Sequence, residues 1–170
     1  IIINNIQQGM GSTLGYIAVI VGLGAMFGAI LESTGGVKEI SRYLLNKFGE
    51  KKSQWALLIS GFFIAIPVFF DVAFILLLPV IYSIQKKSNK SIVYYALPLL
   101  AGLAVTHAFI PPTPGPVAVS QILGADLGYV MLFGLIVGIP SAILSGLIFT
   151  NFITSNINFN SEVVFDTEEL

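Results

Sequence analysis

Residues 53–85 read SQWALLISGFFIAIPVFFDVAFILLLPVIYSIQ, and this stretch decides the fold. A helix needs about 20 residues to cross the apolar core of a bilayer, so the stretch is too long for one crossing and too short for two. Lysines flank it on both sides, at Lys51, Lys52, Lys86 and Lys87. Basic residues mark the cytoplasmic side of a membrane protein. We therefore predict a re-entrant helical hairpin that enters and leaves the membrane on the cytoplasmic side.

The tip of this hairpin is expected at Pro67. Proline has no N–H to donate, and it disfavours helical geometry at the residue before it. We predict a helix on each side of a non-helical tip over residues 67–71. Asp71 belongs to this tip, and it is the only acidic residue between Glu50 and Asp126.

The composition also indicates a membrane protein. Of 170 residues, 55% are hydrophobic and 10% are charged, and the mean hydropathy is +0.89. Soluble domains carry about 25% charged residues. The net charge of −1 and the lack of a basic arm argue against a nucleic-acid partner. The absence of cysteine excludes disulfides and thiolate metal sites. Because the sequence begins with Ile1 rather than Met, we expect an excerpt of a longer protein.

Three more apolar segments predict further membrane spans, over about residues 10–31, 91–123 and 129–149. The second of them contains four prolines within residues 111–116. Such a run cannot lie inside a helix, so we predict a discontinuous helix that resumes at about Val117. Its unwound middle is expected to hold Thr106, His107 and Thr113. Irregular backbone at membrane depth occurs only where protein buries it or where it lines a cavity.

The remaining segments have distinct patterns. Residues 37–50 place apolar side chains on one face and basic ones on the other, which predicts an amphipathic helix at the membrane surface. Residues 151–170 are polar and acidic and are expected to form a loop. The first span contains two Gly-x-x-x-Gly spacings, beginning at Gly11 and at Gly24. Each spacing either forms a close helix contact or reflects the general abundance of glycine in membrane helices.

The two predicted breaks define the candidate binding site. Secondary transporters bind substrates where helices break near the middle of the membrane and helix N-termini point at an anion. The fold class is thus an all-α polytopic membrane protein with a re-entrant hairpin and a discontinuous helix in one transmembrane region over residues 1–170. The candidate binding residues beside the breaks are Phe70, Asp71, Thr106, His107, Thr113, Gly115 and Ser120.

Asp71 and His107 have the most specific chemistry. A carboxylate at bilayer depth is costly and usually functional, so Asp71 could bind and release a coupled proton. The alternative for Asp71 is a cap on the N-terminus of the returning helix. His107 is the only histidine, and it could bind an anionic substrate as a donor or as a cation. The alternative for His107 is a hydrogen-bonded residue of the core.

The other candidates are less specific. The hydroxyls of Thr106, Thr113 and Ser120 could bind substrate, or they could bond carbonyls of their own helices. The side chains of Phe69 and Phe70 are expected to pack against the protein rather than to recognise the substrate.

Several short motifs, taken together in their order along the chain, indicate a protein family. They are residues 11–15 (GSTLG), 21–26 (VGLGAM), 32–36 (ESTGG), 47–51 (KFGEK), 67–74 (PVFFDVAF), 105–112 (VTHAFIPP) and 114–116 (PGP). Together they resemble the gluconate permease family of gluconate:proton symporters over about residues 9–153. That family belongs to a group of ion transporters with inverted repeats and paired re-entrant hairpins. The resemblance implies that this chain is half of such a transporter.

The resemblance also implies a function. It implies proton-coupled uptake of gluconate or a related sugar acid or hydroxy acid by a multi-pass protein of the bacterial inner membrane. Relatives carry idonate, fructuronate, glycerate or D-serine, so the resemblance does not identify the substrate. It also does not decide whether sodium replaces the proton or whether the protein forms a homo-oligomer. No cofactor besides the coupling ion, no metal and no catalytic residue is expected. The family often has His at the position of Thr113 and Lys at that of Ala29, so roles of those residues do not carry over.

Two alternatives belong to other classes. An aspartyl intramembrane protease needs two embedded carboxylates, and Asp71 has no such partner in this chain. A non-transporting membrane fragment is the second alternative, and a second repeat in the same reading frame would argue against it.

Overall fold

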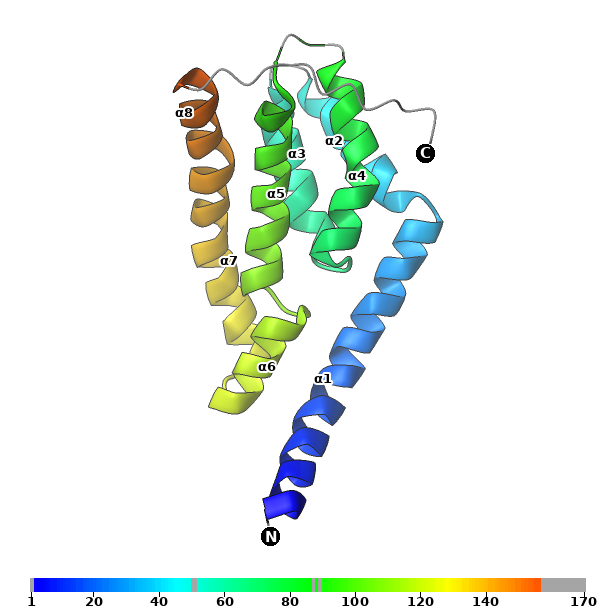
Figure 1. The fold of residues 1–170 in the computed structure, drawn as a ribbon, viewed down its shortest axis with the longest axis vertical. Coiled ribbons are helices and arrows are strands. Elements are labelled where there is room, and N and C mark those ends of the chain that lie inside the picture. The colour runs from blue at the N-terminus through cyan, green and yellow to red at the C-terminus, as the bar shows by residue number, and fades with distance from the viewer. Residues whose placement is uncertain (1, 50–51, 87, 89, 157–170) are drawn as a thin grey trace.

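The computed structural model describes residues 2–49, 52–86, 88 and 90–156. All regular structure in these residues is helical (Figure 1), which confirms the predicted all-α class. In chain order the elements are α1 (Ile2–Ser33), α2 (Gly36–Phe48), α3 (Ser53–Ile64), α4 (Phe70–Gln85), α5 (Ile92–Phe109), α6 (Pro114–Leu123), α7 (Leu127–Ile143), the π-helical turn η2 (Leu144–Ile148) and α8 (Phe149–Asn156).

Three described helical stretches are long and apolar enough to cross a membrane: Ile2–Ser33, Ile92–Leu123 and Leu127–Asn156. They contain the three predicted spans. The first helix was predicted to begin near Met10 but includes the polar residues from Asn4 to Gln8. Hydropathy marks the part of a helix that can lie in lipid, whereas the backbone hydrogen bonds continue through polar side chains.

The short helices α3 and α4 run in opposite directions. The start of α3 and the end of α4 lie at one end of the bundle, together with the start of α5 (Figure 1). The basic residues Lys52, Lys86 and Lys90 therefore share that end. We call it the basic end. The two helices thus form a hairpin, while its re-entrant character, with entry and exit on one side of a membrane, stays a prediction.

Helices α3 and α5 cross in close contact. Gly61 of α3 and Gly102 of α5 face each other's helices, and a Cβ on Gly102 would overlap the backbone carbonyl of Leu58. Glycine is required here for close approach rather than for its backbone angles. Around this crossing lies a core of fully buried side chains from α3, α4 and α5, which includes Leu57, Ile64, Leu77, Ile81, Leu99 and Leu103.

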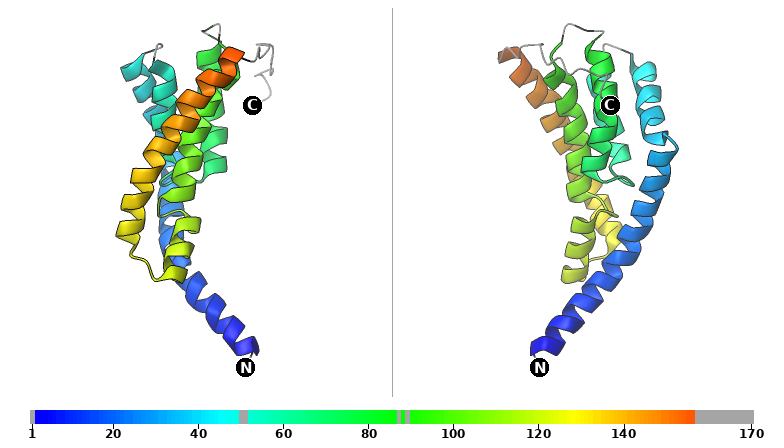
Figure 2. Two further views of the ribbon diagram at one scale, coloured as in Figure 1. Left: turned by 90° about the vertical axis from the view of Figure 1, so that its left-hand side faces the viewer. Right: turned by 45° about the vertical axis from the view of Figure 1, so that its right-hand side comes forward.

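The predicted amphipathic helix is α2. Its residues Val37 and Ser41 are buried, and Val37 belongs to the same core as α3 and α4. Figure 2 shows α2 rising beside those helices instead of crossing their ends. Its position relative to a membrane surface stays a prediction, and Glu50, the predicted last residue, lies outside the described residues.

The last span is longer than predicted. It begins at Leu127, where the Asp126 carboxylate accepts bonds from the N–H groups of Gly128 (2.8 Å) and Tyr129 (3.1 Å), so Asp126 is a helix cap. The span continues through Asn156, so the predicted loop from Asn151 was wrong over its first six residues. Polar threonine and asparagine side chains there donate to carbonyls one turn back, which lets the helix continue. Residues 157–170 lie outside the described part.

Candidate functional site

The first break separates α3 from α4 over residues 65–69. Phe69 has an extended backbone (φ −61°, ψ 145°) and precedes the first residue of α4. The predicted break over residues 67–71 is therefore shifted: Phe70 and Asp71 belong to the first turn of the returning helix. Because proline disfavours helical geometry at the residue before it, the break also includes Ala65 and Ile66.

The second break separates α5 from α6 and confirms the predicted discontinuous helix. The helix resumes at Pro114, earlier than the expected residue 117. Pro114 and Pro116 fit because the first turn of a helix needs no N–H donors. Thr106 and His107 were predicted in the unwound middle, but they lie in the last turn of α5. Only residues 110–113 are non-helical.

His107 is where the two breaks meet. Its ring lies 6.5 Å from that of Phe69 and 6.4 Å from that of Phe70, measured between centroids. The Nδ1 atom of His107 is buried and has no hydrogen-bond partner among the described residues. A buried polar atom without a partner is unfavourable unless it serves a ligand or water. The alternative of a hydrogen-bonded core histidine therefore does not describe this site.

Helix α1 contacts both breaks through two glycines one turn apart. A Cβ on Gly28 would overlap the carbonyl oxygen of Pro67 at the first break. A Cβ on Gly24 would lie 3.4 Å from the Pro112 side chain at the second break. This Gly-x-x-x-Gly spacing is thus a true contact face. At Gly11 and Gly15, in contrast, an added Cβ would have no atom of the described residues within 4 Å.

A small hollow lies where these three elements meet, and Val21, Gly24, Pro67, Phe69, Pro112 and Thr113 are among its lining residues. The helix breaks predicted the place of this site, whereas nothing in the sequence pattern placed α1 in it. The Gly-x-x-x-Gly spacing at Gly24 and Gly28 indicated a close helix contact as one alternative. The spacing alone could not show that this pair of glycines packs against other elements and that the pair at Gly11 and Gly15 does not. Ala29, where the family often has Lys, lies exposed next to this contact.

Thr106 is fully buried in α5 and connects this helix to α3. Its Oγ1 donates to the carbonyl oxygen of Phe62, near the end of α3, at 2.9 Å. The last carbonyls of a helix have no partner within it, so this bond satisfies a group that the first break leaves free. Thr106 is therefore a structural residue that attaches the end of α3 to α5.

Replacing Thr106 with Val is expected to reduce the free energy of unfolding by about 1–3 kcal/mol, because the Phe62 carbonyl loses its buried partner. The matched control is Thr154→Val, since Thr154 donates only to Thr150 of its own helix, at 2.8 Å. Thermal unfolding of both variants in detergent measures the difference. Equal stability of the two variants would contradict the role of Thr106 as a bridge.

Asp71 is exposed on the first turn of α4 rather than enclosed at a tip. Its carboxylate accepts no hydrogen bond from the described residues, so a hydrogen-bonded helix cap was a wrong alternative. A negative charge in the first turn still interacts favourably with the helix dipole. The exposed carboxylate of Asp71 is therefore accessible to a proton or a ligand.

The remaining candidates divide between two places. Thr113 is buried beside the contact with α1 and donates to the Ile110 carbonyl at 2.7 Å. Ser120 donates to Val117 at 2.8 Å, and with Gly115 it lines an apolar groove between α6 and α7. Ser120 therefore bonds a carbonyl of its own helix, which was the alternative for these hydroxyls, whereas the acceptor of Thr113 lies in the break between α5 and α6. Gly115 and Ser120 thus lie apart from the residues gathered around His107.

The amino-acid sequence of this chain has counterparts among known proteins. Residues 1–169 match the family described as GntP family permease. The chain belongs to this family. The resemblance read from the motifs is thereby confirmed, and a transporter rather than an enzyme is the class to which these relatives' names assign them.

Individual relatives of this permease chain are bacterial. It is 48% identical to a gluconate permease of Bacillus licheniformis over 149 residues, which are 88% of this chain and 33% of the relative. It is 42% identical to the Gnt-II system L-idonate transporter of Escherichia coli (strain K12) over 153 residues, which are 90% of this chain and 35% of the relative. The chain therefore spans about a third of the length of these relatives. No solved structure matches it.

Proposed function

We propose that this chain is part of a secondary transporter that takes up gluconate or a related sugar acid together with protons across the bacterial inner membrane. The observation that carries the proposal is His107, whose unpartnered Nδ1 lies beside the rings of Phe69 and Phe70. Relatives named as gluconate permeases and an L-idonate transporter support a sugar acid as the substrate.

The roles of the two titratable residues follow from their surroundings. His107 donates a hydrogen bond from Nδ1 to the carboxylate of the sugar acid, and charged acceptors make such bonds strong. The exposed Asp71, on the neighbouring helix start, binds the proton that moves with the substrate. The inverted repeat predicted from the resemblance supplies the rest of the site in the complete protein.

Replacing Asp71 with Asn tests the coupling role. Asparagine keeps the size and removes the ability to carry a proton, so proton-driven accumulation of gluconate should be abolished. Exchange of labelled for unlabelled gluconate across the membrane needs no net proton movement and should persist. Vesicles that contain the protein expressed from its complete reading frame allow both measurements.

The matched control is Glu32→Gln, because Glu32 is another exposed carboxylate, at the end of α1. This variant should accumulate gluconate normally. Unchanged accumulation by the Asp71→Asn variant would remove Asp71 from the coupling role. An exchange assay with a panel of sugar acids, hydroxy acids and D-serine identifies the substrate, and exchange of none of them would contradict the proposed function.

A further inference from the structure

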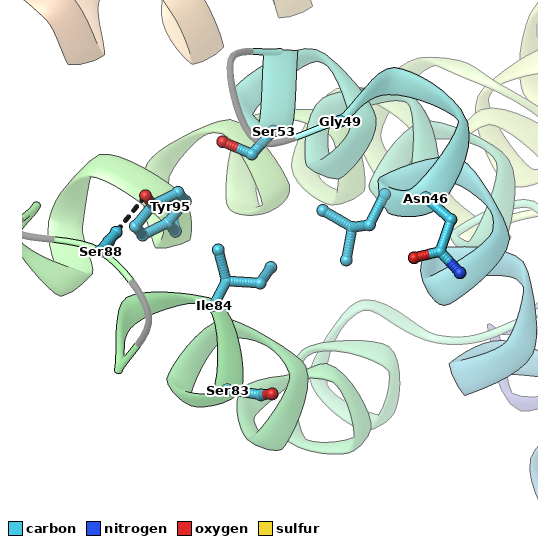
Figure 3. A pocket seen from close by; sticks show the side chains of 8 residues that line it. Asn46, Gly49, Ser53, Ser83, Ile84, Ser88 and Tyr95 are labelled. Atoms are coloured by element: carbon cyan, nitrogen blue, oxygen red, sulfur yellow. Dashed lines mark hydrogen bonds between the residues drawn. The ribbon is translucent and has the colours of Figure 1, made fainter.

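A groove runs between α2 and α4 at the basic end of the bundle, away from both breaks. Its open part is lined by Lys38, Arg42 and Asn46 of α2 and by Pro79 and Ser83 of α4. We call it the α2–α4 groove. Its inner part continues past Asn46 and Ser83 to the start of α3 and to α5, where Ser53 and Tyr95 complete the wall (Figure 3).

The open part of the groove is positively charged. Lys38 and Arg42 are four residues apart, so they lie on one face of α2. Both are exposed, and neither forms an ion pair with a described residue. No acidic side chain is among the described residues that line the groove. Two unpaired cations beside each other repel, which an anion between them would relieve.

The inner part supplies hydrogen-bond donors. Figure 3 shows Asn46, Ser83 and Ser53 around the hollow, each from a different helix. The Tyr95 hydroxyl already donates to Ser88, at 2.9 Å. Asn46 and Ser83 have no such bond to the described part of the chain, so their donors are free for a ligand.

The start of α3 adds to the preference for an anion. No side chain of the described residues caps this helix N-terminus, and such a terminus carries a partial positive charge. Ser53, its first residue, is only 2% exposed yet lines the hollow. Its hydroxyl has no hydrogen-bond partner in the part of the chain that the structure describes. A buried, unpartnered hydroxyl at an uncapped helix start is suited to an oxyanion.

The outer face of α4 continues the groove as apolar surface. Ile75, Pro79 and Ser83 follow at four-residue spacing, so they form one stripe along the helix. Ile75 is 65% exposed. The stripe thus changes from apolar to polar toward the basic end. This is the polarity profile of a phospholipid, whose acyl chains join a charged headgroup, and not that of a small free anion.

We propose that the α2–α4 groove binds the phosphate headgroup of an anionic phospholipid. The Arg42 guanidinium pairs with two phosphate oxygens, a geometry that arginine favours, and Lys38 adds a second charge. Asn46 and Ser83 donate to the remaining headgroup oxygens, and an acyl chain lies along Ile75. The basic end is the one predicted to face the cytoplasm, where anionic lipids attract basic residues.

The test uses the protein expressed from its complete reading frame and purified in detergent. Native mass spectrometry counts bound phosphatidylglycerol and phosphatidylcholine as each lipid is titrated. The wild type should retain phosphatidylglycerol in preference. The double variant Lys38→Gln/Arg42→Gln should raise the Kd for phosphatidylglycerol about 30-fold, the effect expected from two basic residues at a membrane surface. Arg42→Lys should give a smaller loss, because it keeps the charge and removes the paired geometry.

The matched control is Lys47→Gln/Lys52→Gln, which removes the same charge from the same end outside the groove and should leave the Kd within about twofold. Equal Kd values for the two double variants would overturn the proposal, as would equal binding of the two lipids by the wild type. Displacement of phosphatidylglycerol by millimolar inorganic phosphate would reassign the groove to a free anion. Displacement by gluconate would reassign it to substrate. Either result contradicts a lipid site.

Discussion

Replacing Gly28 with Ala is expected to disable transport, although it adds only one methyl group. The added Cβ would overlap the carbonyl oxygen of Pro67 and would lie 3.1 Å from the Pro67 carbonyl carbon. Both are backbone atoms at the first break, so no side-chain rotation relieves the overlap. Overpacking of this kind costs about 1–3 kcal/mol, which reduces the ratio of molecules with α1 docked to those with α1 undocked about 5- to 150-fold.

Gly22→Ala is the matched control for Gly28→Ala. Gly22 lies on the same helix and has open space where the Cβ would be placed. Alanine there should keep uptake and stabilise the helix by about 0.5–1 kcal/mol, because glycine is unfavourable within a helix. Gluconate uptake at equal expression and the Tm in detergent measure both variants. Equal values would mean that α1 does not hold the first break in place.

Replacing His107 with Ala is expected to have the second large effect, on substrate affinity. The variant loses the hydrogen bond that we propose Nδ1 donates to the substrate carboxylate, and bonds to charged groups contribute about 1.5–3 kcal/mol. The KM for the sugar acid should therefore rise about 10- to 150-fold. His107→Gln retains an N–H donor near the same place and should recover part of this loss.

The control for His107 is Ser141→Ala. Ser141 donates only to Val137 of its own helix, at 2.8 Å, and its loss should leave KM unchanged. Phe69→Leu and Phe70→Leu remove the rings beside the imidazole and should raise KM by less than His107→Ala does. Uptake kinetics in vesicles measure these variants. An unchanged KM for His107→Ala would show that the substrate carboxylate binds elsewhere.

The helices and their interruptions could be predicted because their causes are local. A proline at position 67 and the proline run at residues 111–116 prevent helix continuation wherever they stand. The limits of the breaks were less accurate. The first break includes Ala65 and Ile66 and excludes Asp71. The second ends at Thr113, since the first turn of α6 accepts proline.

The contacts between segments could not be predicted from the pattern. Gly11 and Gly24 begin identical spacings, yet among the described residues only the second pair of glycines lies close against other elements. The hydroxyl of Thr106 has an ordinary alternative within its own helix, and its actual acceptor, Phe62, is 44 residues away. Such pairings depend on how α3, α4 and α5 pack, and packing involves residues far apart in the chain.

The amino-acid sequence by itself determined that this chain is helical, that it is apolar enough for a membrane, and that it breaks twice. Those properties follow from side-chain polarity and from proline chemistry at single positions. The tertiary structure alone decided that His107 lies beside Phe69 and Phe70, and that α1 contacts both breaks. The close crossing at Gly61 and Gly102 brings α3 and α5 together, and backbone approach of this kind exists only in three dimensions.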